Sequence, residues 1–242
     1  MAIYSNGQVG WKSGVVVTPT IVTNGLILNL DAGNASSYPG TGTTWTDLSG
    51  NGRNATLANG VGYSSSSGGV LTFDGINDYG QVPAFTYPNS YTVAVWVKIN
   101  YTSSTNYARI IEKGLNNEFA LTINKVTPLY SNKYTYQLGD SDVALASNSP
   151  VSSGYTLLTT TIENATSNQH LIKFYINNTL NNTATKTISF TKTNPLYFGG
   201  NPAALNLTAM LGEIGQIFMY DRVLSASEIT QNFATTKTRF GY

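Results

Sequence analysis

The chain has 242 residues, and all-β sandwiches of about 200–250 residues often form one domain. Its 13 Lys and Arg balance 12 Asp and Glu, and charged residues make up only 10% of the sequence, which excludes the basic surface that nucleic-acid binding needs. There are no cysteines and no apolar stretch of membrane-spanning length, so we expect no disulfide, no thiolate metal site and no membrane partner.

The N-terminal segment, residues 1–24, is predicted to be an arm. Gly7, Gly10 and Gly14 interrupt it, and a short β-prone run at residues 15–18 ends at Pro19. Its first residues have no basic leader, so we expect no export. Residues 25–234 are predicted to form one domain, and residues 235–242 a short polar tail.

Short apolar or alternating runs separated by turn clusters follow the arm, a pattern that predicts two packed antiparallel sheets. Nearly every position of the run 93–97 is apolar, as in a central strand that is covered on both faces. We predict strands at residues 25–30, 70–73, 79–82, 91–99, 108–112, 118–123, 134–138, 155–163, 170–176, 187–190, 196–198 and 212–220.

One helix is predicted near the C-terminus. Ser225 and Glu228 have the spacing of a capping box, in which each side chain accepts a hydrogen bond from a free backbone amide. Ile229 and Phe233 follow at helical spacing. The predicted helix therefore begins at the capping box and turns one apolar face toward the domain.

Three motifs carry a family resemblance. Residues 45–55, WTDLSGNGRNA, look like the loop W-x-D-x-S-G-N-G-x-x-G of laminin-G-like domains, and residues 71–79, LTFDGINDY, resemble the F-D-G-x-N-D-Y signature. Residues 212–229 are similar to the closing pattern of the same domains, with Gly215 in place of the usual Asp. The resemblance implies an all-β, concanavalin A-like jelly-roll sandwich of two antiparallel sheets with one short C-terminal helix.

A narrower resemblance concerns the ends of the domain. Residues 25–34 with 37–45, together with residues 231–242, look like the form that this domain takes in structural proteins of tailed bacteriophages. This resemblance implies a virion surface protein, assembled in the host cytoplasm as a homo-oligomer: a capsid decoration or cement subunit that contacts the major capsid protein or other virion proteins. The residues that we expect at such contacts are Ile3, Tyr4, Trp11, Phe240 and Tyr242.

The alternative function is a glycan-binding receptor module of a phage tail fibre or host-adhesion apparatus. Loop aromatics can stack on the apolar face of a pyranose, and they can equally well be core or interface contacts. The candidates for binding a cell-surface glycan are Trp45, Tyr38, Tyr87 and Tyr101.

Catalysis is not expected. Hydrolases on the concanavalin A-like scaffold resemble one another in a strand with clustered Glu-x-Asp-x-x-Glu carboxylates, because retaining cleavage needs two carboxyl groups about 5–5.5 Å apart. The glutamates here are scattered along the chain, and His170 is the only histidine. The chain is therefore expected to act without catalytic residues.

Calcium is the one cofactor to consider, because Asp74, Asn77 and Asp78 lie close together in sequence and offer the oxygen ligands that this ion prefers. The same side chains commonly cap turns by accepting hydrogen bonds from nearby amides. The two interpretations, a calcium site and a capped turn, both remain open from sequence.

Overall fold

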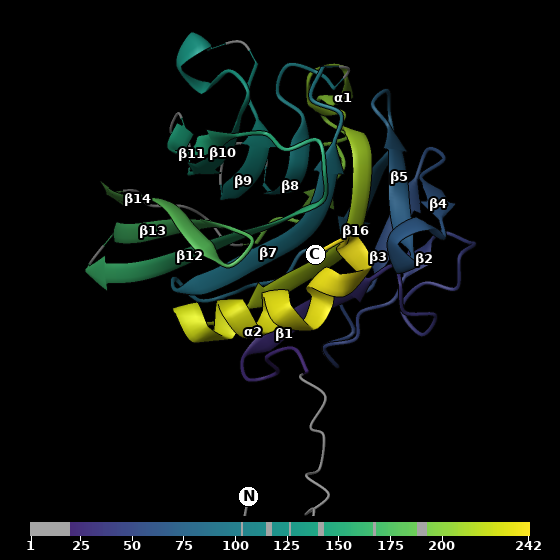
Figure 1. The fold of residues 1–242 in the computed structure, drawn as a ribbon, viewed down its shortest axis with the longest axis horizontal. Helices are drawn as coiled ribbons and strands as arrows, with labels where there is room; N and C mark the ends of the chain where they lie inside the picture. Colours follow the sequence, from purple (N-terminus) through teal and green to yellow (C-terminus); the bar gives the residue numbers. More distant parts are fainter. Residues whose placement is uncertain are drawn as a thin grey trace, which may run out of the picture.

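The computed structural model describes residues 20–102, 104–114, 118–125, 127–139, 143–166, 168–187 and 193–242. Within them, two eight-stranded antiparallel sheets pack face to face, and one helix of three turns lies across the outer face of the first sheet (Figure 1). The predicted jelly-roll sandwich with a short C-terminal helix is thereby confirmed.

The first sheet has the strand order β14-β13-β12-β7-β16-β5-β4, and β1 also pairs with β16. Its strands are β1 (Leu26–Asp31), β4 (Gly62–Ser64), β5 (Val70–Asp74), β7 (Tyr91–Ile99), β12 (Thr156–Thr166), β13 (Gln169–Ile176), β14 (Thr179–Thr187) and β16 (Leu211–Tyr220).

The second sheet has the order β11-β10-β9-β8-β15-β6-β3-β2. Its strands are β2 (Thr44–Trp45), β3 (Ala55–Ala58), β6 (Tyr79–Val82), β8 (Arg109–Lys113), β9 (Phe119–Ile123), β10 (Lys133–Leu138), β11 (Val143–Pro150) and β15 (Leu196–Phe198). Three short helical turns, η1 (Ser66–Gly68), η2 (Pro128–Tyr130) and α1 (Leu205–Thr208), lie in connections between strands.

Residues 93–97 of strand β7 are all apolar because both faces of the strand are covered there. Val93, Val95 and Val97 alternate toward the core between the sheets, whereas Ala94 and Trp96 belong to a second apolar cluster under the C-terminal helix. All five side chains are at most 1% exposed. The structure therefore has a main core inside the sandwich and a smaller core on the outer face of the first sheet.

Helix α2 (Ala226–Thr236) and the turn η3 (Lys237–Phe240) form the lid of this smaller core. The rings of Phe233 and Phe240 stack on Trp96 with centroid distances of 5.7 and 4.3 Å. Gly215 makes the stack possible, since a Cβ atom there would lie 2.5 Å from the Phe240 ring. No helix in the described ranges is long and apolar enough to cross a membrane.

The start of α2 is built as predicted. Ser225 and Glu228 form a reciprocal capping box, and Arg222 donates two further hydrogen bonds to Glu228, of 3.0 and 2.6 Å. The Arg222 guanidinium, with the Ser225 amide, lowers the pKa of Glu228 to about 2. The charged form of Glu228 thus stabilises the folded state.

Most predicted strands lie within a few residues of the observed ones, but β2, β3, β4 and β11 were not predicted, and the polar strand β14 was also missed. It contains Thr, Asn, Ala and Lys with a single Leu, and no apolar alternation marks it in the sequence. The strand predicted at 187–190 shares only residue 187 with β14, and residues 188–190 lie outside the described residues. Pairing with β13 across eight positions determines β14 instead.

Removing the Phe240 ring should destabilise the domain. We expect Phe240→Ala to lower the free energy of unfolding by about 3 kcal/mol, because the ring is 5% exposed and its loss leaves a cavity over Trp96. Urea denaturation followed by tryptophan fluorescence measures this. Ile76→Ala, at a side chain that is 70% exposed, is the control and should change stability by less than about 0.5 kcal/mol. Equal effects of the two substitutions would contradict the assignment of Phe240 to the core.

Glu228→Gln should lower the free energy of unfolding by about 1–2 kcal/mol at neutral pH, because a capping acceptor and an ion pair lose their charge. The folded-state pKa of about 2 lies below the ordinary value of 4.5. The stability difference from the wild type should therefore be complete above pH 4.5 and disappear as the pH falls toward 2. The exposed Glu163→Gln is the matched control, and a pH-independent difference would argue against this role of Glu228.

Candidate functional site

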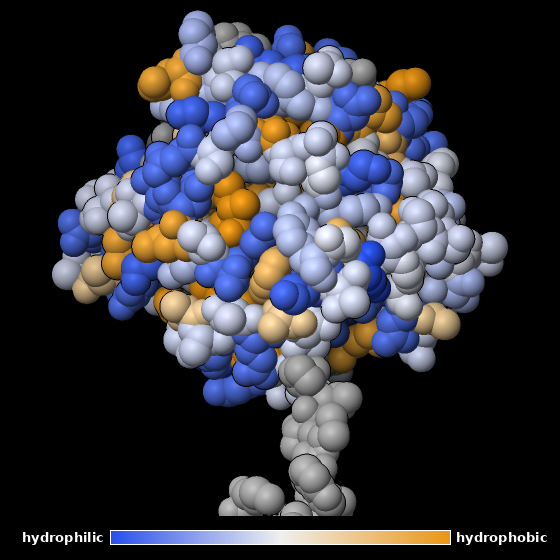
Figure 2. Space-filling view, in the orientation of Figure 1, coloured by the Kyte–Doolittle hydropathy of each residue, from blue (hydrophilic) through white to orange (hydrophobic). Residues whose placement is uncertain are grey.

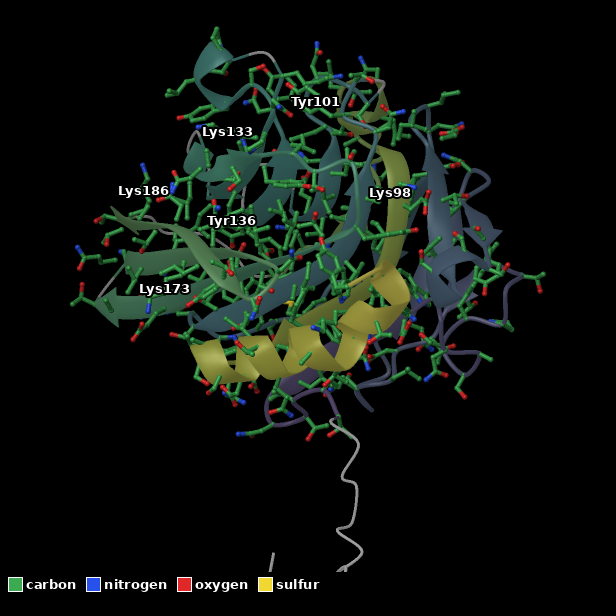
Figure 3. All side chains as sticks on the ribbon, viewed as in Figure 1. Lys98, Tyr101, Lys133, Tyr136, Lys173 and Lys186 are labelled. Atoms are coloured by element: carbon green, nitrogen blue, oxygen red, sulfur yellow. The ribbon has the colours of Figure 1, made fainter. Side chains whose placement is uncertain are left out.

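A groove opens where the helical cover of the first sheet ends. Residues 72–73, 98–102, 151–153 and 211–213 line it, and its volume is about 590 Å³. This size lies within the range of about 300–1,000 Å³ that is usual for small-ligand pockets. We call it the end groove. Figure 3 labels Lys98 beside β16 and Tyr101 in the loop that follows β7.

Three neighbouring strands supply a polar row on one side of the end groove. In the sheet register Glu213 on β16 lies between Lys98 on β7 and Thr72 on β5, so the three side chains share one face. Lys98 follows Trp96 by two residues, which places the row on the outer face just beyond the end of the lid. The polar row therefore lies where the sheet is no longer covered by apolar side chains.

The carboxylate of Glu213 is fixed by two partners. Lys98 Nζ lies 3.2 Å from Oε1, and the hydroxyl of Tyr155 donates to Oε2. Burial, followed by the neighbouring Glu213, raises the pKa of Tyr155 to about 12. The Lys98 side chain is 43% exposed, so its ammonium still has donors for a ligand hydroxyl.

The other side of the end groove carries an aromatic ring. Tyr101 is half-buried, and its hydroxyl accepts a 2.6 Å hydrogen bond from the Asn132 amide and pairs with the Ser131 hydroxyl at 3.2 Å. Lys125 Nζ lies 5.4 Å from the ring centroid. These contacts hold the ring in place in the groove, whose lining also includes the buried residues Phe73 and Ile99.

Of the four aromatic residues predicted to bind glycan, only Tyr101 lies in the end groove. Trp45 is 0% exposed and packs edge-on against Phe198 in the core. Tyr38 and Tyr87 are 4% and 6% exposed. The prediction that these three rings stack on a sugar is corrected, because their faces are already covered by protein.

Tyr87 belongs to a buried polar network instead. Its hydroxyl donates to Glu118, whose carboxylate also pairs with Lys113 at 3.5 Å. Burial lowers the pKa of Lys113 to about 8, against the opposing effect of Glu118. A second buried glutamate, Glu112, accepts a 2.7 Å hydrogen bond from Arg109. Both carboxylates are fully buried and neutralised by a cation, an arrangement that indicates a structural role.

The Asp74–Asp78 segment is a capped turn. Asp74 Oδ1 accepts hydrogen bonds from the amides of Ile76 and Asn77, and Asp78 Oδ2 accepts from the amide of Asp74. Burial raises the pKa of Asp78, which disfavours the charged form that a cation requires. Among the described residues no three His, Cys, Asp or Glu side chains come together as metal ligands. The residues do not fit a calcium centre, and the geometry favours turn capping.

The residues predicted to contact partner proteins lie near the two ends of the chain. Ile3, Tyr4 and Trp11 lie outside the described residues. Phe240 packs inside its own domain, which corrects its assignment to a partner. Tyr242 is 48% exposed, and its hydroxyl donates to the carbonyl of Tyr155 at 2.7 Å.

The polar row was missed from sequence. Lys98, Glu213 and Thr72 are separated by up to 141 positions, and only the register of β7, β16 and β5 brings them together. The one sequence signal for the polar row was the change from Trp96 to Lys98 on the same face of β7. A charged residue at that position marks the end of the covered face.

The capped turn can be tested against the calcium interpretation. Asp74→Asn keeps an acceptor at Oδ1 and should retain nearly full stability, whereas Asp74→Ala should lose about 1 kcal/mol. Thermal unfolding in EDTA and in millimolar calcium chloride should give the same midpoint for the wild type. A midpoint that rises with calcium and falls in Asp74→Asn would restore the calcium site.

Comparisons with known proteins agree with the fold. The chain is similar to the Trypanosoma rangeli sialidase in complex with the inhibitor DANA (TM-score 0.64, 16% identity, 93% of this chain and 36% of that chain). It is also similar to botulinum neurotoxin type C, which interacts with two ganglioside molecules (0.65, 16%, 88% and 52%), and to the binding domain of Paraclostridial Mosquitocidal Protein 1 (0.63, 15%, 87% and 52%).

The chain thus spans about a third to a half of the length of these structures. A search among curated protein sequences gave no match. The family model of the concanavalin A-like lectins and glucanases matches residues 73–230, which include the turn at Asp74, strands β7 to β16 and the start of α2. The chain belongs to the concanavalin A-like lectin/glucanase superfamily.

Proposed function

We propose that the protein is a carbohydrate-binding module and that the end groove is its binding site. The observation that carries the proposal is the pairing of a held aromatic ring, Tyr101, with the polar row of Lys98, Glu213 and Thr72 in one open groove. A pyranose offers an apolar face and a rim of hydroxyls. The groove offers an aromatic ring for the apolar face and charged or hydroxyl side chains for the sugar hydroxyls.

The side chains of the end groove are held rigidly, which also supports carbohydrate binding. Glu213 is held by Lys98 and Tyr155, and the Tyr101 hydroxyl is held by the loop at Ser131 and Asn132. Groups that are already fixed lose little side-chain freedom when a ligand binds, so weak polar contacts can add up to useful affinity. No step of catalysis is proposed, because the buried glutamates have structural partners and Glu213 is held in an ion pair.

The setting we propose is a tail fibre or host-adhesion apparatus of a bacteriophage, supported by the resemblance of residues 25–34, 37–45 and 231–242 to phage structural proteins. The capsid decoration role stays a prediction. It depended on contacts from both ends of the chain, and the ring of Phe240 is used within the domain.

Binding to immobilised glycans tests the proposal. We expect the wild-type protein to bind a subset of bacterial surface polysaccharides on a glycan array, and Tyr101→Ala to lose at least about tenfold in affinity, equivalent to about 1.4 kcal/mol. Tyr101→Phe should retain most of the affinity if the ring itself makes the contact.

The matched control is Tyr63→Ala, which removes another tyrosine, 38% exposed, from outside the end groove. It should leave binding unchanged. Circular dichroism of each variant checks that the fold is intact. Wild-type protein that binds no glycan, or a folded Tyr101→Ala variant with unchanged affinity, would contradict the proposal.

A further inference from the structure

A second cavity lies between the edges of the two sheets, where β11 of the second sheet approaches β14 of the first. Its volume is about 310 Å³, near the lower limit of about 300 Å³ for small-ligand pockets. Asn148 links the two edges, because its backbone amide donates to Asn181 Oδ1 and its side-chain amide donates to the Asn181 carbonyl on β14. We call this space the edge cavity.

The edge cavity contains two lysines. Lys133 at the start of β10 and Lys186 near the end of β14 both line it and are both half-buried. Figure 3 shows them on the same side of the molecule, away from Lys98. In the sheet register, Lys186 on β14 lies opposite His170 on β13. His170 is on the same face of β13 as Ile172, which is buried in the main core. The Lys186 side chain is therefore directed to the inner side of the sheet.

Most other cations in the described residues are neutralised or held, and the exception, Lys173, faces the opposite side of β13. Ion pairs, backbone carbonyls or aromatic rings hold Arg53, Lys98, Arg109, Lys113, Lys125, Arg222, Lys237 and Arg239. Lys133 and Lys186 have no ion pair with any residue in the described ranges, and no carboxylate of those ranges lines the cavity. Two like charges sharing one small cavity are best satisfied by an anion.

The remaining lining of the edge cavity is partly apolar. Leu145 is buried at the base, Leu129 is 69% exposed at the rim, and the half-buried Tyr130 adds a ring and a hydroxyl. Figure 2 shows small hydrophobic areas among hydrophilic ones on the visible face of the molecule. Cations next to short apolar surface suit a single sugar ring with an acidic substituent better than a phosphate backbone, which needs a longer basic stripe.

The edge cavity adjoins the end groove through one loop. Asn132 donates its amide hydrogen to Tyr101 in the end groove and accepts at its carbonyl from Val151, also in that groove. Three residues close to it in sequence, Leu129, Tyr130 and Lys133, line the edge cavity. A carbohydrate chain that occupies the end groove would therefore lie beside the loop that carries three residues of the edge cavity.

We propose that the edge cavity is a subsite for a sugar residue that carries an anionic group, either a carboxylate or a sulfate ester, with Lys133 and Lys186 as the residues that bind the anion. The sugar as ligand class rests on the proposed function. The requirement for an anion rests on the two lysines.

The test measures affinity for three matched probes: tetragalacturonate, a galactose tetrasaccharide and a galactose tetrasaccharide with 6-sulfate groups. We expect the wild type to bind at least one anionic probe about tenfold or more tightly than the neutral one at low salt, and this preference to shrink as salt is added. The two anionic probes distinguish a carboxylate from a sulfate.

The variant Lys133→Gln/Lys186→Gln should bind all probes with the affinity of the neutral one, whereas Lys133→Arg/Lys186→Arg should keep a preference for the anionic probes. Lys173→Gln is the matched control, because Lys173 lies one position from Ile172 on β13 and so faces the opposite side of the sheet. It removes one positive charge without touching the cavity and should leave the preference intact.

Wild-type protein that binds neutral and anionic probes equally would overturn the anionic subsite and leave the proposed function standing. A preference that survives in the folded double glutamine variant would also overturn it. Failure of all three probes, together with an empty glycan array, would remove both proposals. Tight binding of a single-stranded oligonucleotide of equal charge, lost in the double glutamine variant, would reassign the two lysines to nucleic acid.

Discussion

The outer face of the first sheet has to be covered, and the stack of Phe233 and Phe240 on Trp96 meets this need. A β7 strand that is apolar on both faces cannot leave one of them to water without exposing its largest side chain. The lid built from α2 and η3 is therefore part of the domain. Its extent also decides where the polar surface begins, because the row at Lys98, Glu213 and Thr72 starts where the lid ends.

Gly215 links this packing to the family pattern. Laminin-G-like domains resemble one another in an Asp at this position, and here the absence of a side chain makes room for the Phe240 ring. The chain thus has an aromatic contact where the pattern would place a carboxylate. Glycine in place of Asp also removes a negative charge from the outer face. The Arg239 guanidinium donates a 3.1 Å hydrogen bond to the Gly215 carbonyl.

The molecule has few charged residues, and the buried ones have a different role from the accessible ones. Buried pairs such as Lys113 with Glu118 are neutralised within the fold, so they add little to the surface potential. Among the accessible charges, Lys98 and Glu213 line the end groove and Lys133 and Lys186 line the edge cavity, on either side of the loop at Asn132. On a nearly neutral protein, a few such groups are enough to direct a ligand to one side.

The sequence by itself determined the fold class, the central strand β7, and the capping box of α2, because each depends on local spacing of apolar or capping residues. It also identified Tyr101 as a candidate for ligand binding. Only the tertiary structure decided that Trp45, Tyr38 and Tyr87 are core residues, since burial depends on the opposite sheet. Both recesses likewise depend on register between distant strands, which no local pattern encodes, and β14 forms because β13 offers it a free edge.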